Sequence, residues 1–107
     1  MANPKPGSPV RGSTTGRPIM ALLDLLGRRW SLRILWELRS EPLTFRELRD
    51  ACENMSPSVL NQRVDELRAA GILENSDHGY ALTTEGLDLM ESLTPLHFWA
   101  EKWSNRR

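Results

Sequence analysis

Apolar residues recur at helical spacing along most of the chain, and this period is interrupted between Ile72 and Leu82. Residues 1–17 lack the helical pattern, because proline, glycine and short polar residues dominate them. A segment of this composition cannot bury enough apolar surface to offset the entropy that it would lose on folding. The pattern therefore predicts a disordered N-terminal arm over residues 1–17 and one folded domain over residues 18–107.

The stretch from Ser56 to Gly71 carries the clearest helical signal. Ser56 is a favoured N-cap residue, Pro57 suits the first helical position, and Gly71 supplies a stop. Between them lies one narrow apolar stripe, formed by Leu60, Val64 and Leu67. The opposite face carries Ser58, Asn61, Gln62 and Asp65, with Arg63 at its flank. Such a polar face can meet base edges in the major groove of DNA, or it can be an ordinary solvated face, which the helix alone favours.

A shorter helix is predicted just before this one. Thr44 and Glu47 form a capping box, which opens a helix that ends at about Ala51. The linker of residues 52–55 then leads directly into the helix that Ser56 caps. Two short helices joined by a tight connection, the second with a polar face, form a helix-turn-helix arrangement.

The period of the pattern changes after Gly71. Residues 72–75 and 80–82 predict two short strands, joined by a turn at residues 76–79 with His78 at its tip. A hairpin directly after a helix-turn-helix is the wing of a winged helix. The predicted fold is therefore mainly α with a small β-hairpin, an α+β winged helix-turn-helix.

A further helix is predicted from Trp30 to Arg39, with Ser31 as its N-cap and a set of leucine and isoleucine residues pointing inward, namely Leu32, Ile34, Leu35 and Leu38. Arginines gather near its start, at Arg28, Arg29 and Arg33. They are equally consistent with phosphate contacts and with a solvated patch, since arginine clusters are common on surfaces.

Both ends of the folded domain are more apolar than a small core requires. The first helix begins at Pro18 and is apolar over more than half of its circumference. The last helical region is capped near Thr83, is predicted to stop or kink and restart at Pro95, and ends in a tryptophan-rich stretch. We interpret these surfaces as a dimer interface. The predicted interface residues are Ile19, Leu22, Leu23, Leu26, Leu96, Phe98, Trp99 and Trp103.

Composition narrows the classes of function. One cysteine in 107 residues excludes an internal disulfide and fits a reducing cytoplasm. No apolar run approaches the ~20 residues of a membrane span, so we expect a cytoplasmic protein that makes no membrane contact. The net charge is zero and the body without the arm is net −3, which argues mildly against nucleic acid as a partner. No spacing of residues indicates a metal site, a catalytic set or a phosphate loop, so we expect neither an enzyme nor a cofactor.

Taken together, these elements resemble the HxlR-type family of winged helix-turn-helix transcriptional regulators, small bacterial relatives of the MarR group. The resemblance covers roughly residues 18–104. It is carried by motifs that include Leu26-Gly27-Arg28-Arg29-Trp30, Gln62-Arg63, Glu66-Leu67, Leu82-Thr83 and Trp99-Ala100-Glu101-Lys102-Trp103. It implies homodimers that bind palindromic operators, with a recognition helix in each major groove.

Two departures from the family pattern affect what can be carried over. Members often have a cysteine just before the first helix, used in some for redox or electrophile sensing, whereas this chain has Gly16-Arg17-Pro18 there. Cys52 lies elsewhere, between the two helices of the motif, so thiol sensing is not expected. The wing is short and has no Lys or Arg, which leaves His78 as its only candidate for contact with the minor groove.

We therefore predict a homodimeric, sequence-specific regulator that binds double-stranded DNA and acts as a repressor. The residues expected to reach base edges are Ser58, Gln62 and Arg63. The residues expected to hold phosphates are Thr44, Arg46, Arg49 and Ser56. The alternative is a winged-helix module for protein interaction or dimerisation without base-specific binding. A third possibility adds a small-molecule effector, bound between the terminal helices and the core.

Overall fold

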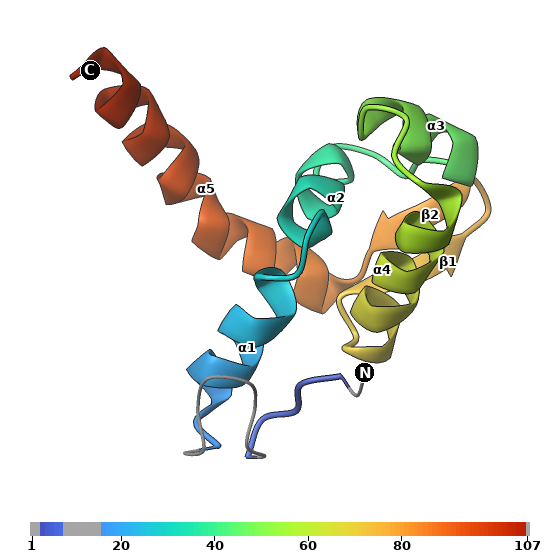
Figure 1. Ribbon diagram of the computed structural model, residues 1–107, viewed down its shortest axis with the longest axis horizontal. Coiled ribbons are helices and arrows are strands. Elements are labelled where there is room, and N and C mark those ends of the chain that lie inside the picture. Colours follow the sequence, from blue (N-terminus) through green and yellow to red (C-terminus); the bar gives the residue numbers. More distant parts are fainter. Residues whose placement is uncertain (1–2, 8–15, 107) are drawn as a thin grey trace.

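The computed structural model describes residues 3–7 and 16–106, and the predicted winged-helix architecture is confirmed within them. Their elements are α1 (Pro18–Leu26), α2 (Ser31–Glu37), α3 (Phe45–Ala51), α4 (Pro57–Ala69), β1 (Leu73–Ser76), β2 (Gly79–Leu82) and α5 (Thr84–Asn105). In Figure 1, α2, α3, α4 and the hairpin form the body of the molecule, and the C-terminal part of α5 extends away from that body.

One apolar core holds the body together. Ile34 and Leu35 of α2, Leu48 of α3, and Leu60 and Leu67 of α4 are all fully buried in it. Each of these helices is too short to be stable alone, so the shared burial of their apolar faces supplies most of their stability. The polar face of α4 is left on the outside.

Local capping explains where three of the helices begin. The Thr44 hydroxyl accepts from the backbone N–H of Glu47, and the Glu47 carboxylate accepts from the backbone N–H of Thr44, which completes the predicted capping box of α3. In α4 and α5 the cap is a single hydrogen bond: the hydroxyl of Ser56 accepts from the backbone N–H of Val59, and that of Thr83 accepts from the backbone N–H of Gly86. Gly71 lies just past the end of α4 with φ +80°, the left-handed conformation that glycine adopts most readily.

The start of α2 differs from the prediction. Trp30, with φ 76°, turns the chain sharply after α1, and Ser31 becomes the first residue of the helix, with its side chain buried. The prediction of Ser31 as the N-cap is therefore wrong, and its hydroxyl has no hydrogen-bond partner among the described residues. Leu32 was expected to point inward but is exposed, because this start rotates it to the outer side of the short helix.

The hairpin is tighter than predicted. Ser76 pairs with Gly79, so both belong to strands and only Asp77 and His78 form the loop. Leu43, just before α3, adds an antiparallel bridge to Tyr80. A side chain at Gly79 would collide with the backbone of Leu43, so this close approach depends on glycine. The wing is therefore fastened to the segment that leads into α3.

The last helix neither stops nor restarts at Pro95. It runs without a break from Thr84 to Asn105, which makes that prediction wrong. Pro95 lacks an N–H for the carbonyl of Glu91, but Glu91 is exposed, so water can take the place of the lost bond. Just before the proline, the Thr94 hydroxyl donates to the carbonyl of Met90 at 2.8 Å.

Part of the expected N-terminal arm lies against the body. The Asn3 side chain donates to the carbonyl of Glu66 in α4 at 2.8 Å and accepts from the Arg28 guanidinium at 3.1 Å. Residues 1–2 and 8–15 of the predicted arm lie outside the described residues. The contacts of Asn3 place this end of the described residues 3–7 beside α4.

Candidate nucleic-acid interface

A hydrogen bond from a side chain of α3 holds the turn between α3 and α4. Glu53 and Asn54 both have positive φ angles, which bring the chain back on itself. The Arg49 Nε donates to the carbonyl of Met55 at 2.7 Å and so ties α3 to the residue that precedes the cap of α4. Arg49, predicted as a phosphate contact, therefore also braces the helix-turn-helix, which no pattern in the sequence indicated.

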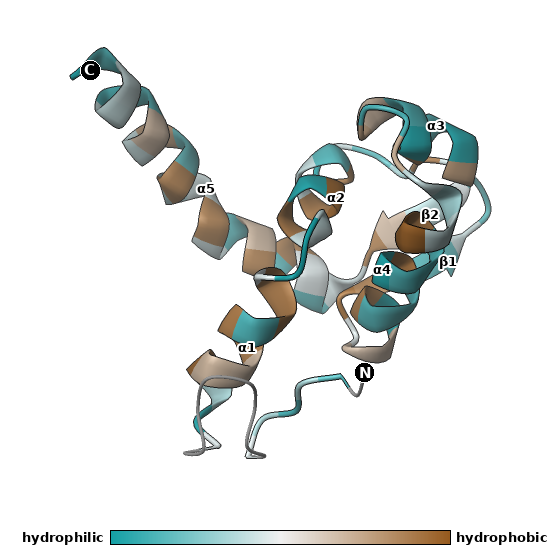
Figure 2. Ribbon diagram, in the orientation of Figure 1, coloured by the Kyte–Doolittle hydropathy of each residue, from teal (hydrophilic) through white to brown (hydrophobic). Residues whose placement is uncertain are grey.

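The outer face of α4 presents short polar side chains. Ser58, Asn61 and Gln62 are exposed over its first two turns, while Leu60 and Val64 on the opposite side are buried. Ser58 lies 3.0 Å, oxygen to oxygen, from the capping hydroxyl of Ser56. In Figure 2 much of the α4 ribbon is teal, the colour of hydrophilic residues. The predicted positions of Ser58 and Gln62 on one accessible face are thus present in the structure.

Asn61 completes this face, although the prediction of base-reading residues left it out. It follows Ser58 by three positions and is exposed beside Gln62. Residues three and four apart share one side of a helix, so the spacing was the available signal. Asparagine and glutamine can each make a bidentate contact to adenine, which makes Asn61 as suitable for base reading as Gln62.

Arg63 is not on this face. Its Nε donates to the carbonyl of Arg29 at 2.7 Å, and its guanidinium pairs with the carboxylate of Glu66 at 3.0 Å. The side chain is only 15% exposed. In this conformation the chain's own groups satisfy the guanidinium on the flank of α4 that faces the start of α2, and the contact of Arg63 with base edges stays a prediction.

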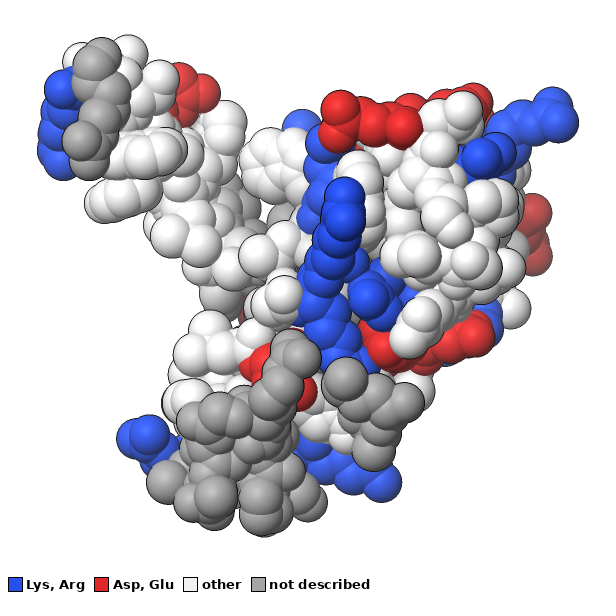
Figure 3. All heavy atoms as spheres, in the orientation of Figure 1, with Lys and Arg blue, Asp and Glu red and all other residues white. Residues whose placement is uncertain are grey.

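The arginine cluster near α2 is largely neutralised by carboxylates. Arg28 is buried and pairs with Glu66 at 2.8 Å and more loosely with Asp24. Arg33 pairs with Glu37 and donates to the backbone of α3. Figure 3 shows blue side chains through the middle of this face lying directly against red ones. Arg28 and Arg33 thus hold helices together. Arg28 is buried, whereas the Arg33 side chain is 39% exposed, so a solvated position and a phosphate contact both stay open for Arg33.

The phosphate-contact residues on α3 have unequal exposure. The Thr44 hydroxyl is used by the capping box, and its side chain is half-buried. Arg46, in the first turn of α3, is exposed and has no ion pair with any residue that the structure describes. Of the predicted phosphate contacts, Arg46 is the one whose charge is displayed to solvent.

The histidine at the wing tip lies beside α3. The Nε2 of His78 lies 3.2 Å from the carboxylate of Glu47, the capping-box residue of α3. The hydrogen bonds from Thr44, helped by His78, hold the pKa of Glu47 below its usual range. The His78 side chain is still 64% exposed, so its contact with the minor groove stays a prediction.

The predicted dimer residues fall into two groups. Leu26 is buried in the chain's own core, so it has no surface to offer a partner, and Leu22 is partly buried. The remaining six are exposed, on α1 at Ile19 and Leu23 and on α5 at Leu96, Phe98, Trp99 and Trp103. The rings of Trp99 and Trp103 stack on each other with centroids 6.0 Å apart. Apolar residues thus recur along α5 where it leaves the body, as the brown segments of its ribbon show (Figure 2).

Other kinds of site find little support in the described part of the chain. Residues 3–7 and 16–106 contain no group of three or more acidic, histidine or cysteine side chains placed to hold a metal ion. Within the same residues, no helix is both long and apolar enough to cross a membrane. Cys52 is buried at the end of α3, and this burial raises the pKa of its thiol.

The architecture and the polar-faced second helix of the motif define a winged helix-turn-helix protein of the class that regulates transcription by binding DNA. Comparison with known proteins makes this more specific. The chain belongs to the HxlR-like helix-turn-helix family, whose model matches residues 25–107.

The relatives are regulators of similar length. The uncharacterized HTH-type transcriptional regulator YvaP of Bacillus subtilis is 30% identical over 88 residues, which cover 76% of this chain and 82% of YvaP. Among solved structures, quinone-bound YodB from B. subtilis superposes with a TM-score of 0.72 at 28% identity, covering 78% of this chain and 96% of YodB. A possible HxlR family transcriptional factor from Thermoplasma volcanium superposes with a TM-score of 0.71 at 27% identity, covering 82% and 85%.

Proposed function

We propose that this protein is a repressor that binds a palindromic operator as a homodimer, with α4 of each protomer reading bases in the major groove. The observation that carries the proposal is the exposed face formed by Ser58, Asn61 and Gln62 on the first two turns of α4. In this motif the N-terminal residues of the second helix are the ones that reach base edges. These three side chains are short or carry amides, and they can lie close to the bases.

Backbone contacts in the proposed complex come from the N-terminal ends of α3 and α4. Arg46 supplies an exposed positive charge, and Ser56 and Thr44 lie at helix ends whose partial positive charge favours phosphate. Arg49 acts on DNA mainly through the turn that it braces. The complex therefore depends on few cations for each protomer, which predicts a modest salt slope.

The proposed dimer forms through α1 and α5. The exposed apolar residues of α5 lie where the helix extends beyond the body, and no described part of the same chain covers them. Apolar surface of this kind marks an interaction site in a protein of this size. In a two-fold dimer the two α4 helices would meet half-sites about one helical turn (~10 bp), or a multiple of it, apart.

The test is selection of bound sequences from random duplex DNA by the full chain. We expect an inverted repeat whose preferred bases lie in two blocks separated by about one helical turn. Placing that site across a promoter should reduce transcription in a purified system, because the bound dimer covers it. Selection that yields no shared sequence would contradict base reading, and increased transcription would contradict repression.

The alternative is a winged-helix module that binds protein without reading bases. It is favoured by the internal pairing of Arg28, Arg33 and Arg63, which leaves little free positive charge near α4. Salt distinguishes the two functions. Counterion release makes DNA affinity fall as salt rises, with a modest slope where few phosphates are contacted, whereas the affinity of an apolar docking interface stays constant or rises.

A further inference from the structure

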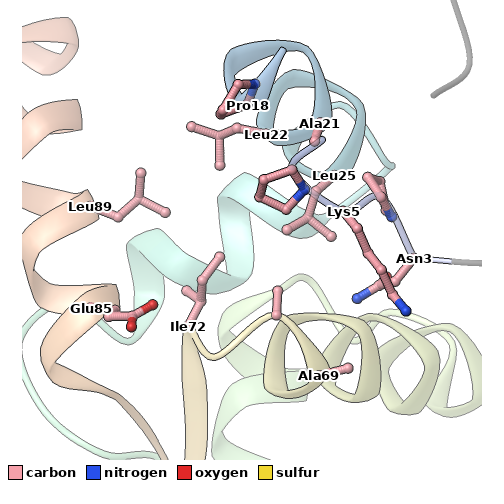
Figure 4. Close-up of a pocket in the computed structure, with 13 residues that line it drawn as sticks. Asn3, Lys5, Pro18, Ala21, Leu22, Leu25, Ala69, Ile72, Glu85 and Leu89 are labelled. Carbon is pink, nitrogen blue, oxygen red and sulfur yellow. The ribbon is translucent and has the colours of Figure 1, made fainter. Parts of the chain in front are cut away.

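A cavity lies between the two terminal helices and the end of α4. Its volume is about 590 Å³, and its walls come from α1, α5, the residues that follow α4, and the N-terminal residues 3–6. In Figure 4, the side chains of Leu22, Leu25, Ile72 and Leu89 converge on this space from different elements. A volume of roughly 300–1,000 Å³ with convergent apolar walls is typical of sites for small organic molecules.

The chemistry of the walls specifies an uncharged ligand. Most lining residues are leucine, isoleucine, alanine or proline, and the three polar ones are Asn3, Lys5 and Glu85. Lys5 and Glu85 lie on opposite sides of the space in Figure 4, so the walls carry one positive and one negative group. An ion of either sign entering this apolar space would lose its hydration and would meet a charge of its own sign as well as one of the opposite sign. A mainly apolar, neutral molecule with one hydrogen-bonding group fits these walls.

The cavity wall is connected to the DNA-reading helix through one side chain. Asn3, at the start of the wall formed by residues 3–6, donates to the carbonyl of Glu66 in α4 at 2.8 Å. It also accepts from Arg28, whose guanidinium pairs with the Glu66 carboxylate. Ala69 in the last turn of α4 lines the same cavity. A molecule that enlarges or fills the cavity must therefore act on the residues that set the position of α4.

We propose that this cavity binds an uncharged, mainly apolar small molecule, and that its occupancy changes DNA affinity through the contact of Asn3 with α4. The second half of the proposal rests on the DNA-binding function proposed above, and the first half does not. Occupancy and DNA binding are therefore measured separately.

The first experiment measures occupancy without DNA. N-phenyl-1-naphthylamine, a neutral fluorophore that brightens in apolar sites, is titrated into the full chain. We expect saturation at one molecule per chain. Leu89→Trp places a larger side chain in the cavity from α5. It should weaken probe binding by about tenfold or more, because the tryptophan ring occupies the space that the probe needs. Leu87→Trp, an exposed position on the same helix, should change it less than about twofold.

Two further variants keep this experiment decisive. Ala69→Leu narrows the cavity at a position where leucine is a good helix former, so it should also weaken binding if Leu89→Trp fails to fold. Leu32→Ala removes an exposed apolar side chain of α2 that does not line the cavity and should leave probe binding unchanged. A titration without saturation, equal binding by the filled and control variants, or loss of binding in Leu32→Ala would overturn the site.

The second experiment measures coupling on the selected operator. The saturating probe should change the Kd for DNA by about fivefold or more, the usual lower range for linked sites. Asn3→Ala should reduce that change to less than about twofold while probe binding persists. An unchanged DNA Kd, or full coupling in Asn3→Ala, would overturn the connection. Failure of all DNA binding with intact probe binding would instead overturn the proposed function and leave the cavity site standing.

Discussion

Two neighbouring residues on α4, Gln62 and Arg63, should respond to truncation in opposite ways. Gln62 is exposed on the polar face, and Arg63 is held by the carbonyl of Arg29 and the carboxylate of Glu66. Sequence alone treats both as base readers. The proposed function gives Gln62 a role in DNA specificity, and the contacts of Arg63 give that residue a role in stability, so the paired substitutions Gln62→Ala and Arg63→Ala test the central geometry of the site.

The magnitude for Arg63→Ala follows from its contacts. A hydrogen bond to a charged group contributes about 1.5–3 kcal/mol, and most of this applies here because the side chain is only 15% exposed. Glu66 keeps its pair with Arg28, which limits the loss. We expect a decrease of about 2 kcal/mol in the free energy of unfolding, or a fall in Tm of roughly 10 °C for a domain of this size. The base preference should be unchanged.

The matched control is Arg68→Ala on the same helix. Arg68 also pairs with a carboxylate, Asp65, but its side chain is 40% exposed, and solvent weakens such a pair to below about 1 kcal/mol. Thermal unfolding of the wild type, Arg63→Ala and Arg68→Ala compares the contribution of a buried ion pair with that of a surface ion pair. Equal Tm changes for Arg63→Ala and Arg68→Ala would refute the buried role of Arg63.

Gln62→Ala should leave Tm nearly unchanged and weaken operator binding by roughly 1–3 kcal/mol for each half-site. Its effect should be confined to the selected operator and should relax the choice of base at one position, as measured by repeating the sequence selection. Equal weakening of operator and random DNA would refute base reading by this face.

Three further outcomes are expected. Trp99→Ala should weaken the dimer by about 2 kcal/mol or more, as measured by sedimentation, because it removes a large side chain from the proposed interface. Glu101→Ala should leave the dimer unchanged. A wild-type protein that is monomeric at tens of micromolar concentration would contradict this prediction. Since the folded pKa of Glu47 is depressed, its stabilisation is present above the ordinary glutamate pKa and lost as pH falls through the folded value, so Tm should fall less on acidification in Glu47→Gln than in the wild type. Cys52 should react with iodoacetamide far more slowly in the native than in the unfolded protein, because it is buried and its thiol pKa is raised, and Cys52→Ser should leave the response of DNA binding to peroxide unchanged.

The elements that sequence predicted well are those whose causes are local. The capping box of Thr44 and Glu47 and the stop at Gly71 depend on residues within one turn, so pattern and structure agree. Pro95 shows the limit of local rules, because the cost of proline within a helix falls where the freed carbonyl can meet water. Its exposure depends on the course of α5 beyond the body, which no local pattern encodes.

Charged side chains were predicted less well because their partners lie far away in sequence. Arg63 contacts the backbone 34 residues earlier, and Arg28 contacts both Asn3 and Glu66. A pattern of arginines near a recognition helix is compatible with phosphate contacts until the carboxylates that neutralise them are located. Asn3 was assigned to a disordered arm for the same reason, since composition predicts the behaviour of a segment only when the rest of the fold offers it no partner.

The buried pair of Arg28 and Glu66 gives the proposed dimer a fixed reading geometry. Arg28 follows α1, which carries part of the proposed interface, and Glu66 belongs to α4, the helix proposed to read bases. Removing one member of such a pair leaves a buried charge, so the two helices are strongly held in one relative position. Two half-sites can be read together only if each α4 keeps its place relative to the dimer axis. In the proposed dimer, the distance between half-sites would then be set inside each protomer, by the same contacts that hold Arg28 and Arg63 within the chain.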